Sequence, residues 1–206
     1  MDQTPREEIW NAVSHGVGIL FALVGMFFLL NYNSGRSEYS TFSIVVYSLS
    51  MMLLFSASTI YHAVTNLKLK EFLRKLDHIS IYFLIAGTYT PIALISLVGT
   101  SGWTIFWIVW SIAIVGTVMK IFFTGRFEKL SLFLYLAMGW LIVFDISNLI
   151  TEMSATGLIL MALGGAFYTL GTLFYAVRKI PYNHVIWHFF VLGGAVSHYF
   201  MVMEVI

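Results

Sequence analysis

The sequence has no cysteine and very little charge. Without cysteine it can form no disulfide, no thiolate metal site and no cysteine nucleophile, so any bound metal must be held by nitrogen and oxygen ligands. Only 10% of the 206 residues are charged, whereas soluble domains carry about a quarter. The formal net charge of +1 gives no reason to expect a nucleic-acid partner. With 59% apolar residues, the composition is typical of an integral membrane protein.

Seven apolar segments are each long enough to cross a bilayer, which takes about 20 residues of helix. The breaks between them are short and polar, and none has room for a second domain. Pro91 lies inside the third segment, where a kink is expected and is tolerated in a membrane helix. The sequence therefore predicts an all-α fold in which residues 1–206 form a single seven-helix transmembrane domain. The expected helices are residues 10–31, 43–65, 77–98, 103–123, 130–150, 156–177 and 184–205.

The positive charges indicate how the seven helices are oriented. Of the 11 Lys and Arg residues, all but Arg36 fall at one end of a seven-helix arrangement. Positive charge accumulates on the cytoplasmic side of membrane proteins. We therefore expect a multi-pass cell-membrane protein whose N-terminus is cytoplasmic and whose C-terminus is outside. The residues at the predicted cytoplasmic end are Arg6, Lys68, Lys70, Arg74, Lys75, Lys120, Arg126, Lys129, Arg178 and Lys179.

Ionisable side chains inside a membrane are costly, so each one is a candidate functional group. Counting from the nearest basic residue of the cytoplasmic loops places four such groups roughly 3 to 13 Å below the cytoplasmic surface. They come from three different helices, whereas unrelated placements would scatter through the bilayer. These four groups are His62, Asp77, His184 and His188.

His184 and His188 are four residues apart, which puts both imidazoles on one face of a helix, about one turn apart. Two imidazoles so placed can bind one metal ion, as in the helical H-E-x-x-H motif. His62, at similar depth, would complete a three-histidine set that commonly binds catalytic zinc (Zn²⁺) and leaves a fourth position open for water. Other first-row metals also bind such a set. Ser58 precedes His62 by four residues and so shares its helix face.

Each of these residues also has a structural interpretation. Two histidines on one helix face can simply hydrogen-bond to other helices. Asp77 can serve as the N-cap of the third helix, and Ser58 can bond back to its own helix backbone. Packing, interfacial or solvated roles are expected for the remaining ionisable groups, which are His78, Asp145, His198 and Glu204.

The first segment carries Glu7, Asn11 and His15 at intervals of four residues, on one helix face at the cytoplasmic boundary. We expect the side chains on this face to orient the groups around the histidine set, as hydrogen-bonding residues around a metal site do. An ordinary polar turn at the membrane interface is the alternative interpretation.

Four short motifs follow one another along the chain: EEIWNAVSHGVG, the S-x3-H of SASTIYH, LDH followed by GTYTP, and the H-x3-H of HVIWH. Together, over nearly the whole chain, they resemble the hemolysin III branch of the progestin and adipoQ receptor family, which includes the adiponectin receptors. The short length is similar to that of the bacterial members, which implies a bacterial inner membrane. The resemblance further implies that His62, His184 and His188 bind zinc, that Asp77 contacts the zinc-bound water and that Ser58 lies beside it.

The same resemblance groups the chain with alkaline ceramidases and implies metal-dependent amide hydrolysis of lipids. The leading hypothesis is therefore a zinc-dependent hydrolase of acyl lipids in the inner leaflet, with an amide- or ester-linked acyl lipid as substrate. In it, Asp77 acts as general base on the water and Ser58 orients the water or helps to hold the oxyanion. Membrane lipids are the expected partners, and the sequence identifies no protein partner.

The sequence can also be compared with three functions other than hydrolysis. The main alternative is a non-enzymatic sensor or receptor in which zinc holds the second and seventh helices together. A wide pore is disfavoured because the intramembrane polar groups gather at one end and do not line a path across the membrane. A retinal protein is disfavoured because the seventh segment has no lysine for a Schiff base.

Overall fold

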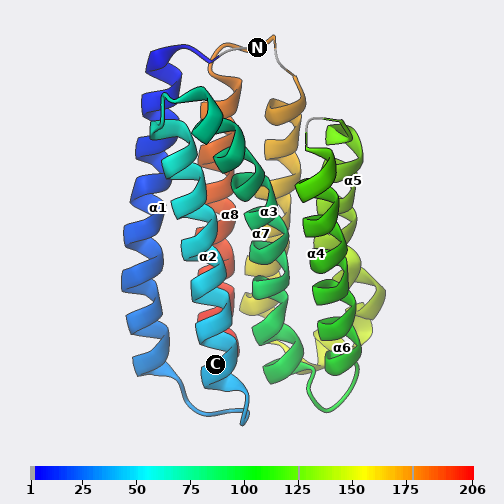
Figure 1. The fold of residues 1–206 in the computed structure, drawn as a ribbon. Coiled ribbons are helices and arrows are strands. Elements are labelled where there is room, and N and C mark those ends of the chain that lie inside the picture. Colours follow the sequence, from blue (N-terminus) through cyan, green and yellow to red (C-terminus); the bar gives the residue numbers. More distant parts are fainter. Residues whose placement is uncertain (1–2, 125, 178) are drawn as a thin grey trace.

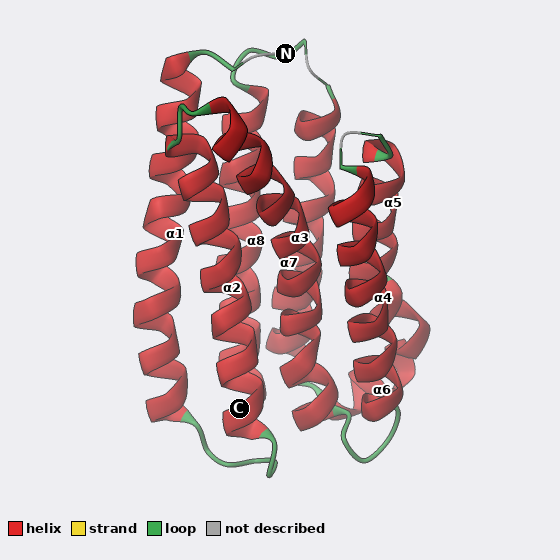
Figure 2. Cartoon of the chain, in the orientation of Figure 1, coloured by secondary structure: helices red, strands yellow, loops and turns green. Residues whose placement is uncertain are grey.

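The computed structural model describes residues 3–124, 126–177 and 179–206, and every regular element within them is a helix (Figure 2). In this part of the chain, seven stretches of helix are long and apolar enough to cross a membrane, which confirms the predicted fold. The helices are α1 (Pro5–Tyr32), α2 (Ser40–Ala63), α3 (Leu67–Pro91), α4 (Gly102–Phe123), α5 (Glu128–Gly139), α6 (Ile146–Glu152), α7 (Ala155–Ala176) and α8 (Asn183–Val205).

Two of the seven crossings are composite. A π-helix, Ile92–Ser96, continues α3, so the third crossing runs from Leu67 to Ser96. A 3-10 helix, Leu141–Asp145, joins α5 to α6, so the fifth crossing runs from Glu128 to Glu152. The seventh crossing is therefore the helix labelled α8.

The third helix begins ten residues earlier than predicted, at Leu67 rather than at Asp77. The Asn66 side chain caps it by accepting a hydrogen bond from the Leu69 amide at 3.1 Å. The interpretation of Asp77 as an N-cap is therefore wrong, because this residue lies inside the helix. The error has a physical cause: apolar length reveals only the part of a helix that crosses the hydrocarbon core, whereas a good N-cap allows the helix to continue beyond it.

The irregularity expected at Pro91 takes the form of a change in helix type. Proline has no N–H, and its ring clashes with the carbonyl four residues earlier. After Pro91 the backbone follows the wider π-helical path, in which the Leu97 amide donates to the Ile92 carbonyl at 3.0 Å. The third crossing is also the most enclosed, with 78% of its apolar window buried, compared with 17% for the fifth.

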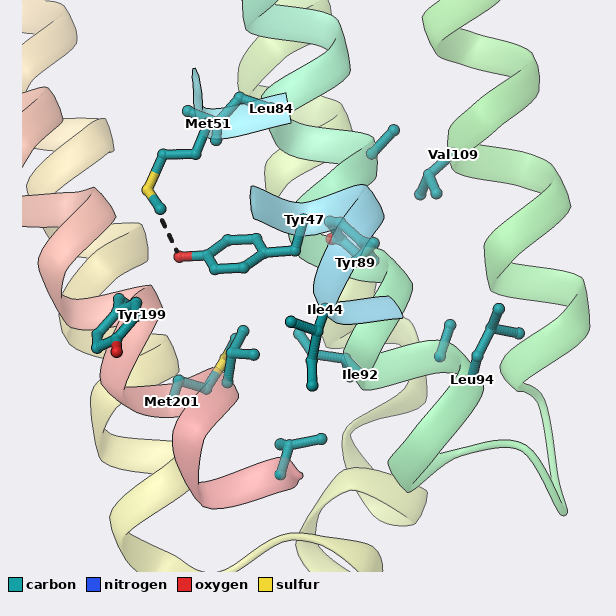
Figure 3. Packing of buried hydrophobic residues seen from close by; sticks show 14 of the residues in the cluster. Ile44, Tyr47, Met51, Leu84, Tyr89, Ile92, Leu94, Val109, Tyr199 and Met201 are labelled. Atoms are coloured by element: carbon teal, nitrogen blue, oxygen red, sulfur yellow. Dashed lines mark hydrogen bonds between the residues drawn. The ribbon is translucent and has the colours of Figure 1, made fainter. Parts of the chain in front are cut away.

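The apolar core fills the half of the bundle in which α2 begins and α8 ends (Figure 3). Tyr47 and Met51 of α2 are almost fully buried there, and the Tyr47 hydroxyl donates to the Met51 sulfur at 3.9 Å. Tyr89 of α3 and Tyr199 of α8 pack into the same core. The buried histidines His15, His62 and His188 lie in the other half of the bundle.

The start of α1 and the α2–α3, α4–α5 and α7–α8 loops all lie at one end of the bundle (Figure 1). The described basic residues of the predicted cytoplasmic set belong to this end, whereas Arg36 lies at the opposite end and donates to the Glu152 carbonyl at 3.1 Å. Arg178, another member of the set, lies outside the described residues. The charges are thus segregated as predicted, and the cytoplasmic location of this end stays a prediction.

Candidate metal centre

The three candidate metal ligands meet at the basic end of the bundle. His62 lies in the last turn of α2, and His184 and His188 lie in the first two turns of α8. One ring nitrogen from each lies within 4.8 Å of the other two. The centroid of the His62 ring lies 5.2 Å from that of His184 and 5.0 Å from that of His188. The tertiary fold therefore brings together the set expected from spacing and depth.

The ring of His62 is oriented by a carboxylate. Its Nδ1 atom lies 2.7 Å from Oε2 of Glu8 on α1. A carboxylate accepts a hydrogen bond, so Nδ1 carries a proton, and in the neutral imidazole Nε2 then keeps its lone pair. That Nε2 atom is buried and has no hydrogen-bond partner among the described residues. A buried nitrogen lone pair without a partner is costly, and a bound cation would relieve the cost.

The ring of His188 is oriented by the backbone of α1. Its Nδ1 atom lies 3.2 Å from the Asn11 carbonyl oxygen and 3.2 Å from the Ser14 hydroxyl. The Ser14 hydroxyl itself donates to the Asn11 carbonyl at 3.0 Å. Because a carbonyl only accepts, Nδ1 of His188 is the donor and its Nε2 atom keeps the lone pair.

This donor set fits a divalent transition metal. It consists of neutral imidazoles, two of which have their Nδ1 protons engaged by acceptors, the arrangement that fixes tautomer and ring direction at metal sites. With no thiolate in the chain, the site offers nitrogen and oxygen ligands only, which suit zinc and its first-row neighbours.

Asp77 and Ser58 lie beside the histidines. Asp77, half-buried on α3, interacts with the side chains of Ser58 and His62. The Ser58 hydroxyl is buried next to the Asp77 carboxylate, but in a geometry that falls outside a hydrogen bond. Asp77 of α3 and Ser58 of α2 therefore lie next to each other, and Asp77 lies beside His62.

The carboxylate in direct contact with the cluster is Glu8, whereas Glu7 caps α1 and interacts with the backbone of Tyr182, at the start of α8. Glu7 forms a capping box with Thr4 at the start of α1, where its Oε2 atom accepts from the Thr4 amide at 2.8 Å. The prediction followed four-residue steps from His15, and two such steps overshoot two turns of an α-helix, which take about 7.2 residues. Glu8 lies seven residues before His15 and so almost directly beneath it. A spacing of seven residues from His15 would therefore have indicated Glu8.

Asn11 and His15 do lie behind the cluster. The Asn11 side chain is buried and donates to the Gln3 side chain at 2.7 Å. The His15 ring stacks on the His188 ring with centroids 3.6 Å apart and planes within 4°. On another side, His15 meets the ring of Phe55 edge to face at 5.1 Å. The first helix thus supports the His188 ligand through both a hydrogen bond and a ring stack.

The remaining ionisable groups lie in other contacts. Asp145 accepts hydrogen bonds from Ser101 and Asn148, and Glu204 accepts one from Ser154. His78 lies 3.6 Å from Glu128, which also pairs with Lys120 at 2.8 Å. Lys120, which the sequence places among the basic residues of the cytoplasmic end, is buried.

An apolar cavity of about 110 Å³ lies between α3, α5, α7 and α8. Ile81 and Trp187, close in sequence to Asp77 and His188, line one part of it, together with Tyr135, whose hydroxyl donates to the His78 carbonyl at 2.8 Å. Gly165 and His198 line another part. The cavity spans Trp187 to His198 on α8, about 16 Å along that helix.

Comparison with known proteins identifies the family of this chain. The pattern of the haemolysin-III-related family matches residues 3–199. The chain belongs to this family. It is 46% identical over 201 residues to the hemolysin-3 homolog of Bacillus subtilis, covering 97% of this chain and 94% of that protein. It is 42% identical to hemolysin-3 of Bacillus cereus over 204 residues, covering 98% and 93% of the two chains.

A more distant relative is the human monocyte to macrophage differentiation factor, 31% identical over 210 residues that cover 98% of this chain and 85% of the human one. This match connects the chain to the progestin and adipoQ receptor proteins, as the motif resemblance indicated. Seven apolar crossings and the Bacillus relatives together identify a multi-pass bacterial membrane protein.

Proposed function

We propose that this haemolysin-III-related protein is a zinc-dependent hydrolase of amide- or ester-linked acyl lipids, working in the cytoplasmic leaflet. The observation that carries the proposal is the buried Nε2 atom of His62, which has no partner among the described residues and belongs to a ring next to two more imidazoles. Asp77 and Ser58 beside that cluster supply the proton-accepting and hydrogen-bonding groups that hydrolysis needs.

Zinc bound by the three histidines would act as a Lewis acid that activates water and polarises the substrate carbonyl. Asp77 takes one proton from the attacking water while the water oxygen bonds to the carbonyl carbon. The Ser58 hydroxyl donates a hydrogen bond to the oxyanion that develops. As the C–N or C–O bond breaks, Asp77 returns the proton to the leaving nitrogen or oxygen, so the products are a fatty acid and an amine or alcohol.

The apolar cavity supports an acyl substrate. Trp187 lines it and directly precedes His188, so the cavity begins one residue from a metal ligand. Its walls are predominantly hydrocarbon and aromatic, as expected for an alkyl chain. Because all of its walls are membrane-crossing helices, a chain can reach it from the bilayer without passing through water.

A second candidate is a zinc-stabilised sensor without catalysis. The favouring observation is that the cluster connects three helices: His62 belongs to α2, the other two ligands belong to α8, and Glu8 belongs to α1. A metal at this point would bias any movement of these helices against one another.

The deciding experiment measures metal and turnover on the same samples. Detergent-purified wild type should contain about one zinc per chain, lost in the His184→Ala/His188→Ala variant. It should release fatty acid from a panel of amide- and ester-linked acyl lipids, and Asp77→Asn should keep the zinc but lose turnover. A wild type without metal would overturn the zinc site. Full zinc with no turnover of any acyl lipid would favour the sensor.

A further inference from the structure

The apolar cavity contains a histidine, His198 of α8. The threonine hydroxyls of the same cavity are already engaged: those of Thr88, Thr169 and Thr172 each donate to a carbonyl of their own helix at 2.7 Å. Since these protons are in use, none of the three hydroxyls can donate to a ligand, and that of Thr169 also accepts from the Trp140 indole at 3.0 Å.

The ring of His198 has one nitrogen engaged and one available. Nε2 lies 3.2 Å from the Met161 carbonyl oxygen of α7. A carbonyl cannot donate, so Nε2 carries the proton and Nδ1 keeps a lone pair. Nδ1 is buried and has no partner among the described residues. An unpaired acceptor in apolar surroundings is costly, and a donor brought by a ligand would relieve the cost.

The ring is also fixed in position. A Cβ atom on Gly164 of α7 would lie 2.2 Å from Cδ2 and 2.3 Å from Nε2 of His198, so this edge of the ring rests directly against the glycine. The Nδ1 edge therefore points away from the α7 backbone. The Tyr168 ring packs against the imidazole with centroids 5.5 Å apart. The ring is thus held between Gly164 and Tyr168 at the wall of the cavity.

We propose that His198 selects acyl lipids that carry a hydroxyl group part-way along the chain, by accepting a hydrogen bond from that hydroxyl. This inference deepens the proposed function and rests on it. His198 lies ten residues beyond His188 on α8, about 15 Å along the helix. The hydroxyl must therefore lie about 15 Å from the carbonyl that reacts at the histidine cluster. A hydroxyl close to the carbonyl carbon cannot reach Nδ1.

The test is binding without turnover. Displacement of a fluorescent fatty acid from the detergent-purified full chain is measured with stearic acid, 12-hydroxystearic acid and 2-hydroxystearic acid. Wild type should bind the 12-hydroxy acid about three- to tenfold tighter than stearic acid, the range expected for one buried hydrogen bond. The 2-hydroxy isomer, whose hydroxyl lies beside the carboxylate, should show no gain that depends on His198. His198→Leu should lose the preference, and Thr88→Val, a matched change to an engaged hydroxyl in the same cavity, should keep it.

The preference ratio separates the role of His198 from general damage, because a partly misfolded variant loses both ligands alike. Equal binding of the three acids by wild type would overturn the inference and leave the hydrolase proposal intact. So would a preference that survives in His198→Leu. If wild type bound none of the acids, both the inference and the acyl-lipid part of the proposed function would fall. Should His198→Leu not fold, the comparison of the positional isomers in wild type still decides the question.

Discussion

The carboxylate of Glu8 lies 2.7 Å from Nδ1 of His62, 54 residues further along the chain. Its other oxygen pairs with the Lys70 ammonium at 3.0 Å. Lys70 also donates to the carbonyls of Tyr61 and Val64 at the end of α2, at 3.1 and 3.3 Å. It thereby satisfies acceptors that a helix C-terminus leaves open. One carboxylate thus connects α1, α2 and α3 at a candidate metal ligand.

Replacing Glu8 by alanine should weaken zinc binding about 10- to 100-fold, the usual effect of removing the group that orients a histidine ligand. Competition with a zinc chelator of known affinity measures it. Glu7→Ala is the matched control, because it removes the same charge one residue away from a carboxylate that caps α1. Equal zinc affinity in the two variants would show that Glu8 does not support the ligand.

Removing the metal should lower the melting temperature of the wild-type protein. An ion that binds only the folded state, and that would here connect α2 to α8, stabilises that state by mass action. Thermal unfolding in detergent, with and without a chelator, gives the shift. The His184→Ala/His188→Ala variant should melt at one temperature in both conditions, and a chelator effect of similar size in that variant would contradict the assigned ligands.

Removing only one partner of the Lys120–Glu128 pair should destabilise the protein more than removing both charges. The Lys120 side chain is only 3% exposed and its Nζ atom lies 2.8 Å from Glu128 Oε2. Glu128→Gln leaves that ammonium buried without its counter-charge and should destabilise the protein by about 3 kcal/mol. The double variant Lys120→Met/Glu128→Gln removes the unpaired charge and should recover most of the loss. Chemical denaturation in detergent compares the three proteins, and no recovery in the double variant would argue against a charge effect.

Two adjacent glycines of α7 should respond differently to alanine. A Cβ atom on Gly164 would meet the His198 ring at 2.2 Å, whereas on Gly165 the nearest atoms belong to Trp140 at 3.7 Å, an ordinary contact. Gly164→Ala should therefore cost about 1–3 kcal/mol, the range for overpacking. Gly165→Ala should be neutral or slightly stabilising, since alanine favours helix more than glycine does. Equal melting temperatures of the two variants would contradict the packing of α7 on α8.

The orientation can be measured with reporter fusions. Alkaline phosphatase, which is active only outside the cytoplasm, should be active when fused after Ile206 and inactive when inserted in the α2–α3 or α4–α5 loops. The physical reason is that the basic residues of those loops favour the cytoplasmic side. Activity at the loops and none after Ile206 would invert the topology and place the histidine cluster in the outer leaflet.

Much of the architecture follows from the sequence alone. Seven apolar lengths and the segregation of basic residues define the crossings, because the cost of exposing a polar backbone to lipid leaves helices of about 20 residues as the solution. His184 and His188 share a helix face through their spacing, and His62 joins them through its equal depth. These are properties of single helices, so they can be predicted from the sequence alone. The start of α3 was not predicted because that part of the helix lies beyond the apolar stretch.

Only the tertiary structure shows which groups hydrogen-bond to the candidate ligands and which residues line the interior cavity. Glu8 rather than Glu7 meets His62, the Asn11 carbonyl orients His188, and an apolar cavity leads from Trp187 to His198. Each contact depends on how far a helix is rotated about its own axis. In a soluble protein, the apolar stripe reveals that rotation. In a membrane the lipid is as apolar as the core, so the outward and inward faces of these helices look alike in sequence.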